Sequence, residues 1–312
     1  MTSLTSALAL ALALAPVLAQ VAAVGGGAGC ASGRFHPAGD DVEDPVDGAA
    51  AVDAAPGLDG PTIDGLAPDA APAAISPLLL SELVLAPNGA EMIELVNPTS
   101  APVSLRNYYL TDVPTYFRLP TAGHTVEASD FIVRFPVGAT IPARGVVTVA
   151  LDTAASFTAA TGSAPTYSVA GNTMELIAGT TPTLTNSGEP VVVFYWDGAS
   201  DRVVDVDVML AGAPTASNAL MNKSGLTVDG PDADGVASTY ATDAMTIADQ
   251  AGLPAAGMST KRIALESAAT ETQSGGNGVL GQDETSERTG TTWDGSGFTA
   301  PTPGTVPATL LP

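Results

Sequence analysis

Carboxylates are the reactive side chains that this sequence offers in number: it has 33 Asp and Glu against 10 Lys and Arg, two His and one Cys. A serine or cysteine nucleophile needs a His base and an orienting acid. The two His are His36 and His124, the second in a Gly-containing turn, and no Gly-x-Ser-x-Gly motif occurs. We therefore predict no catalytic residues of the nucleophile, His and acid type.

Hydrolysis by paired carboxylates is the enzymatic alternative, because two acids at strand ends can meet in a folded chain. Glu91 and Glu94 lie three residues apart and so point to opposite faces of a strand, which argues against a joint role. Such a hydrolase requires acids from different loops to converge on a concave pocket and to have perturbed pKa values. We predict that the protein is not an enzyme.

Calcium is the one cofactor that the acids suggest, since a hard cation takes carboxylate and carbonyl oxygens from a tightly curved backbone. Asp229, Asp232 and Asp234 lie within six residues and are followed by Gly235. The helix-loop-helix calcium consensus has a ligand rather than a Gly at its first position and a Glu at its closing position. This loop has neither. The alternative is a solvated Asp-Gly turn, and we interpret residues 283–287 as a solvated acidic loop as well.

The single Cys lies at the end of an apolar leader. Residues 8–24 are apolar except Gln20, which is typical of an export signal, with a membrane span as the alternative. Gly27-Ala28-Gly29-Cys30 is similar to a bacterial lipoprotein box, although Leu is usual where Gly27 stands. We predict that residues 1–30 are an export signal and that Cys30 carries a lipid anchor to a membrane. Cleavage after Ala19 would instead release the protein.

Residues 31–75 form a zone rich in Ala, Pro, Gly and Asp. It contains nine acids against one base, Arg34, and one aromatic residue, Phe35. Such a segment buries too little apolar surface to offset the entropy of ordering it, and its like charges repel. We predict a disordered acidic linker that holds the following domain away from a membrane.

The remaining chain alternates short apolar runs with turn residues, which favours an all-β, immunoglobulin-like antiparallel β-sandwich. In residues 202–208 the acids Asp205 and Asp207 fall two apart, so we expect them to share one face and to leave Val204, Val206 and Val208 for the core. One helix is expected at residues 153–160. The predicted strands are residues 78–85, 92–96, 131–135, 146–151, 191–196 and 203–208.

Three stretches carry a resemblance to a known family: residues 91–98 (Glu-Met-Ile-Glu-Leu-Val-Asn-Pro), residues 103–112 and residues 184–198. They resemble the opening hairpin, the Val-x-Leu-x-Gly-Trp-x-Leu-x-Asp stretch and the Asn-Ser-Gly-acid turn of the lamin-tail domain. Asn107 and Tyr108 replace the Gly and Trp of that pattern. We predict such a domain over residues 76–308, with an insertion at 213–257 that contains a short helix at 240–251.

The resemblance implies a non-catalytic module whose strand acids lie on the sandwich surface. A net charge of −23 with no basic patch excludes nucleic acid as a partner. We expect an extracytoplasmic surface module in a bacterial cell envelope or on an outer membrane, for attachment, adhesion or scaffolding through an unknown protein or glycan. The alternatives are the carboxylate hydrolase and a calcium-stabilised structural surface protein.

Overall fold

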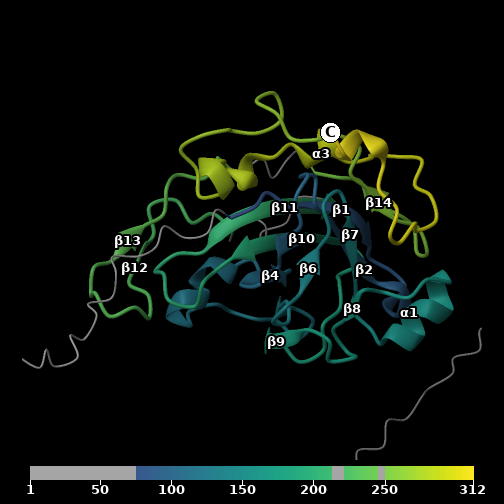
Figure 1. Ribbon diagram of the computed structural model, residues 1–312, viewed down its shortest axis with the longest axis horizontal. Coiled ribbons are helices and arrows are strands. Elements are labelled where there is room, and N and C mark those ends of the chain that lie inside the picture. The colour runs from purple at the N-terminus through teal and green to yellow at the C-terminus, as the bar shows by residue number, and fades with distance from the viewer. Residues whose placement is uncertain (1–74, 213–220, 245–249) are drawn as a thin grey trace, which may run out of the picture. The chain divides into compact units, whose positions relative to one another are not determined.

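The computed structural model describes residues 75–212, 221–244 and 250–312 (Figure 1). The chain divides into two units, residues 1–65 and 66–312, and the described residues belong to the second. The predicted export signal, Cys30 and nearly all of the predicted linker at 31–75 lie outside the described residues.

Two five-stranded sheets form the framework, as predicted for an all-β sandwich. In the first sheet the order is β14-β1-β2-β7-β8, and only the β7-β8 pair is parallel. Its strands are β1 (Leu79–Val84), β2 (Met92–Val96), β7 (Val146–Ala150), β8 (Tyr167–Ser168) and β14 (Thr260–Lys261).

The second sheet has the order β11-β10-β4-β5-β9 and is antiparallel throughout. Its strands are β4 (Tyr108–Thr111), β5 (Ile132–Arg134), β9 (Glu175–Ala178), β10 (Gly188–Tyr195) and β11 (Val204–Gly212). Two short pairs are the remaining strands in the described part of the chain: β3 (Val103–Ser104) with β6 (Thr140–Ile141), and β12 (Thr227–Val228) with β13 (Ser238–Thr239).

All six apolar runs that we predict as strands are strands, namely β1, β2, β5, β7, β10 and β11. Their Val and Ile side chains fit a pleated, buried surface, which is why these runs are readable from sequence. The strands that were not predicted from apolar runs, such as β8 and β9, are short or carry partly exposed residues.

The main core lies between the two sheets. Leu83 and Ile93 of the first sheet belong to one buried cluster with Leu110, Val133 and Val193 of the second. The second sheet is also covered on its other face, where Tyr109, Phe194 and Val208 pack with residues of the segments that flank the sheet. A strand buried on both faces reads as a continuous apolar run, as residues 191–194 do.

Asp205 and Asp207 of β11 are both fully buried, and the prediction that they share one face of the strand is wrong. The pairing of β10 with β11 shifts register between Val193 and Phe194, so the bulge breaks the alternation of side chains at this point. Tyr116 donates a hydrogen bond of 2.6 Å to Asp205, whereas the backbone N–H of Leu80 donates to Asp207. The two acids therefore have different surroundings.

A C-terminal segment covers this part of the sandwich (yellow in Figure 1). It brings in Arg262, which is fully buried. Its guanidinium donates to both carboxylate oxygens of Asp207 at 2.7 and 2.8 Å and to Glu287 at 2.7 Å. The acidic loop at 283–287 is buried rather than solvated, so that prediction is wrong; Arg262 supplies the charge that allows Glu287 inside.

Lys223 is the second buried base. Its ammonium lies 2.6 Å from Asp205 Oδ2 and 3.2 Å from Asp243 Oδ1, with all three side chains inaccessible or nearly so. The backbone N–H of Lys223 also donates to Asp243. The charges of this interior are thus paired with bases from segments distant in sequence.

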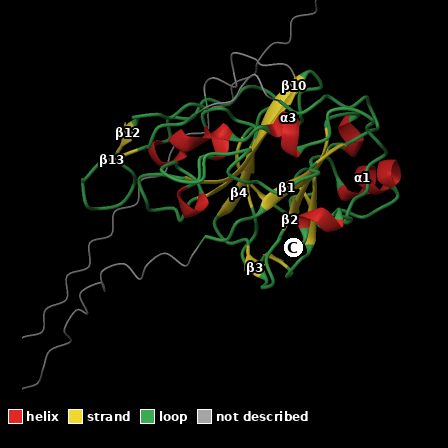
Figure 2. Ribbon diagram, turned by 90° about the horizontal axis from the view of Figure 1, so that it is seen from above, coloured by secondary structure: helices red, strands yellow, loops and turns green. Residues whose placement is uncertain are grey.

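Helices are few and short (Figure 2). The predicted helix at 153–160 is α1 (Ala154–Thr161), in which Thr153 accepts a hydrogen bond from the N–H of Ser156 and Gly162 ends the helix with φ +76°. The others among the described residues are α3 (Thr289–Thr292) and the 3₁₀ turns η1 (Asn88–Ala90), η2 (Tyr116–Thr121), η3 (Val279–Gly281), η4 (Glu284–Ser286) and η5 (Ala308–Leu310).

The predicted helix at 240–251 falls partly outside the described residues, which omit 245–249. Residues 240–244 and 250–251 are not helical. Across the described ranges, no helix has the length and apolar character needed to cross a bilayer.

Candidate functional site

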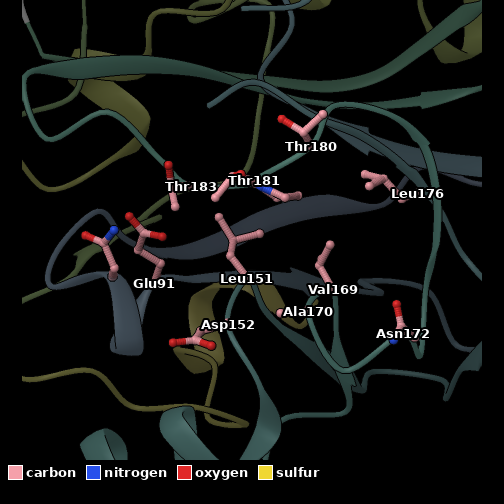
Figure 3. Close-up of a pocket in the computed structure, with 12 residues that line it drawn as sticks. Glu91, Leu151, Asp152, Val169, Ala170, Asn172, Leu176, Thr180, Thr181 and Thr183 are labelled. Carbon is pink, nitrogen blue, oxygen red and sulfur yellow. The ribbon is translucent and has the colours of Figure 1, made fainter. Parts of the chain in front are cut away.

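A cavity of about 470 Å³ opens at one end of the sandwich (Figure 3). It lies between η1, the end of β7, the turn after β8, β9 and the loop that follows β9. Its lining residues are Asn88, Glu91, Leu151, Asp152, Val169, Ala170, Asn172, Leu176, Thr180, Thr181, Pro182 and Thr183.

Glu91 is the buried acid of this cavity, with 1% of its surface exposed. Its Oε1 accepts a hydrogen bond of 3.2 Å from the N–H of Leu184, and its Oε2 has no partner among the described residues. Burial raises the pKa of Glu91 to about 8, and Asp152 and Glu189 add repulsion. The carboxyl is therefore mostly protonated at neutral pH.

The walls of the cavity are apolar and its rim is polar. Leu151 and Val169 are buried, and Leu176 is 42% exposed. Asp152 adds a second carboxylate, and the three threonines at 180, 181 and 183 add hydroxyls. None of the twelve lining residues is aromatic. The arrangement suits a ligand with an apolar stem and a polar or cationic end.

Glu91 and Glu94 are not on the sandwich surface as the family resemblance implies; they are 1% and 0% exposed. Their partners differ, as predicted from their opposite directions on a strand. Glu94 accepts hydrogen bonds from Ser81, Thr148 and the N–H of Gly304, the last 210 residues away. The C-terminal segment that supplies Gly304 is what buries this acid.

A second cavity, of about 270 Å³, is lined by Asp112, Asp130 and Glu189. The loop after β9 separates it from the first cavity, because Thr183 lines one and Thr185 the other. Burial raises the pKa of Asp112 to about 10 and that of Glu189 to about 7. Acids from different segments thus converge on a concave pocket and have perturbed pKa values, as a carboxylate hydrolase requires.

The predicted calcium loop is partly assembled. Asp229 and Asp232 lie with Asp201 in a group whose carboxylate oxygens are within 4.8 Å of one another, but Asp234 is outside that group. Hydrogen bonds from Ser238 and from the N–H of Gly230 hold the pKa of Asp201 below its usual range. Asp234 accepts from the N–H of Val236. Ordinary donors therefore already satisfy part of this loop.

The remaining predicted positions take no part in either cavity. His124 is a half-buried loop residue and lines neither cavity, while His36 and Cys30 are outside the described residues. The acids that converge on the second cavity, Asp112, Asp130 and Glu189, were not singled out from sequence, although Asp112 and Glu189 stand in the stretches 103–112 and 184–198. Their signal is position: Asp112 directly follows β4, Asp130 lies just before β5, and Glu189 lies at the start of β10.

Comparisons with known proteins leave the family open. No family model matches the chain, and no curated protein matches it. Among solved structures it is similar to a DUF4876 family protein from Bacteroides thetaiotaomicron, with 12% identity, a TM-score of 0.38, and coverage of 75% of this chain and 72% of that chain. Similarity at this level does not establish a shared family, so what is established is a β-rich sandwich, on the evidence of its own strands.

Proposed function

We propose that the protein is a non-catalytic extracytoplasmic surface module of lamin-tail type, which attaches to a partner by receiving a basic side chain in the Glu91 cavity. Cys30 would carry the lipid anchor and residues 31–75 the spacer. The role is attachment, adhesion or scaffolding at a cell surface. The lamin-tail assignment is supported by the quoted stretches, whose residues fall on β2, β4 and β10.

The observation that carries the proposal is the unpartnered oxygen of Glu91 at an apolar-walled cavity. A lysine or arginine side chain has an apolar stem and a cationic head. Leu151 and Val169 match the stem, and Glu91 with Asp152 matches the head. A sugar ring would find no aromatic face in the lining, so we favour a protein partner over a glycan.

Charge complementarity points the same way. The chain carries a net charge of −23, which attracts basic partners and accelerates their encounter at low salt. A buried carboxyl also makes the contact selective, because a neutral side chain would leave the Glu91 oxygen without a partner.

The pH dependence of binding follows from Glu91. A cationic head pairs best with the ionised carboxylate, so binding releases a proton wherever Glu91 is protonated in the free protein. With a pKa of about 8, we expect affinity to rise by up to about tenfold per pH unit up to that value and then to level off.

The test is a titration of the full chain with Nα-acetyl-lysine amide, followed by backbone amide NMR. Shifts are expected at residues 151, 169, 180, 181 and 183, and Glu91→Gln should abolish them while preserving the fold, since Gln resembles the neutral acid. The matched control is Glu175→Gln, because Glu175 pairs with Arg134 outside the cavity. Shifts elsewhere, or shifts unchanged in Glu91→Gln, would contradict the proposal.

The anchor has its own test. Mass spectrometry of the mature protein should find an acylated Cys30 at the N-terminus. An N-terminus at Gln20 with unmodified Cys30 would refute lipidation and leave a secreted protein.

A carboxylate hydrolase is the second candidate, favoured by one observation: a carboxylate oxygen of Asp112 and one of Glu189 lie within 4.8 Å of each other at the second cavity. Two such groups can share one proton and act as an acid and a base. The check is turnover of a chromogenic glycoside and of a labelled protein substrate. Activity that disappears in Asp112→Asn would replace the binding proposal.

A further inference from the structure

Asp112, Asp130 and Glu189 meet because three neighbouring strands end together. Asp112 directly follows β4, Asp130 precedes β5, and Glu189 is the second residue of β10. The register pairs Thr111 of β4 with Val192 of β10 and with Ile132 of β5. The C-terminal end of β4 therefore lies beside the N-terminal ends of β5 and β10, and the three acids come to one edge.

The spacing of their oxygens suits a single ion. One carboxylate oxygen from each residue lies within 4.8 Å of the other two. Calcium binds oxygens at about 2.3–2.6 Å, so two of its ligands can be at most about 5 Å apart. The side chains are enclosed, since Asp112, Asp130 and Glu189 are 1%, 8% and 6% exposed.

Asp112 supplies a second and independent observation. Its Oδ1 accepts a hydrogen bond of 2.7 Å from the N–H of Phe131, but its Oδ2 has no hydrogen-bond partner among the described residues. The carboxyl of Glu189 lies beside it and offers a further oxygen. A cation between the two acids would give Asp112 Oδ2 a partner.

The described residues provide no base here. No lysine or arginine forms an ion pair with any of the three acids in the described ranges. By contrast, the two largely buried acid groups that contain Glu266 adjoin Arg262, whose charge would repel a metal ion. Thr115, Thr185 and Ser187 also line the cavity, so its remaining wall is polar.

We propose that Asp112, Asp130 and Glu189 bind one calcium ion in the 270 Å³ cavity at this edge of the second sheet. The ion fastens β4, β5 and β10 to one another and fixes the loop that separates the two cavities. This site lies apart from the Asp229 loop, and it does not depend on the partner contact proposed at Glu91.

The experiment uses the full chain, freed of metal with chelator and titrated with calcium chloride by calorimetry. One calcium per chain is expected. At a calcium concentration about 100 times Kd, the melting temperature should rise by about 5–10 °C for a domain of this size. Chelator should reverse the rise.

Two isosteric variants locate the ion. Asp112→Asn and Glu189→Gln keep an amide N–H that can donate to the remaining carboxylate, so the fold is expected to persist. Each should lower calcium affinity at least about tenfold, because affinity follows the number of charged ligands. The matched control, Asp232→Asn, should bind calcium like the unmodified chain.

Backbone amide NMR of the unmodified chain gives a measurement that needs no variant. Calcium should shift the amides of residues 112, 130 and 189 and leave those of 229, 230 and 232 in place. Lack of binding would overturn the proposal, as would binding that survives in both variants or shifts confined to 229, 230 and 232. Turnover lost in Asp112→Asn without any calcium effect would assign these acids to the hydrolase candidate instead.

Discussion

Two of the regions in which this sandwich buries acids differ in what accompanies those acids. Under the C-terminal segment, Asp207 and Glu287 surround Arg262, and Asp205 and Asp243 surround Lys223. At the sandwich end, Glu91 and the Asp112, Asp130 and Glu189 group have no base paired with them in the described residues.

The difference separates structural acids from candidate functional ones. A buried charge is tolerable when a base and hydrogen bonds compensate it, and it is costly alone. Glu284, which also lies in this region, has an unpartnered oxygen, and burial raises its pKa well above the usual range. Removing a base from the first region should therefore lower the stability of the fold, whereas removing an acid from the second region should raise it.

The largest loss of stability is expected from Arg262→Met. Asp207 and Glu287 would remain buried without their base, and breaking such a pair costs about 3–5 kcal/mol. Urea unfolding followed by circular dichroism measures the loss. A change below about 1 kcal/mol would mean that the acids are protonated and that the two regions do not differ as described.

A smaller loss of stability is expected from Gly179→Ala, at the end of the sandwich that holds the two cavities. Gly179 has φ +105°, and an added Cβ would collide with the backbone carbonyl of Asp130. We expect a loss of about 2 kcal/mol from strain and displacement of the loop that separates the two cavities. Gly198→Ala, also at positive φ (+89°) but in open space, is the control and should cost less.

Glu91→Gln should raise the stability of the fold instead of lowering it. The pKa of Glu91 is raised from 4.5 to about 8, so the folded state holds a proton that the unfolded state releases, and stability falls as pH rises across this interval. At pH 9 the variant should be more stable by about 1–2 kcal/mol, below the full value of the shift because the cavity admits water. Near pH 4.5 the two proteins should unfold alike.

The check on Glu91→Gln is thermal or urea unfolding over the pH series, with Glu175→Gln as the exposed control. A constant difference between the variant and the unmodified chain at all pH values would show that Glu91 is not titrating in the folded protein.

The smallest effect is expected from Arg134→Gln. Arg134 and Glu175 form an ion pair whose side chains are 36% and 53% exposed. Solvent screens such a pair, so the loss should be about 0.5 kcal/mol or less in urea unfolding and should shrink further in high salt. A loss comparable to that of Arg262→Met would remove the distinction between enclosed and exposed pairs.

The strands were predictable because each depends on a local pattern. Residues 92–96 form β2 with the predicted bounds, and Thr153 caps α1 next to it in sequence as its type suggests. The same local logic failed at Asp205 and Asp207, since a register shift against β10 changed the direction of side chains that alternate in sequence.

The sequence by itself determined the class of fold, the acidic balance and the absence of a Gly-x-Ser-x-Gly motif, because composition and short-range patterns are enough for these. Only the tertiary structure decided which acids are paired. Arg262 reaches the carbonyl of Leu80 across 182 residues, and Asp112 meets Glu189 through strands that neighbour each other in space but not in sequence. The environment of a carboxylate is set by such distant contacts, since burial and neighbouring charge are properties of the packed chain.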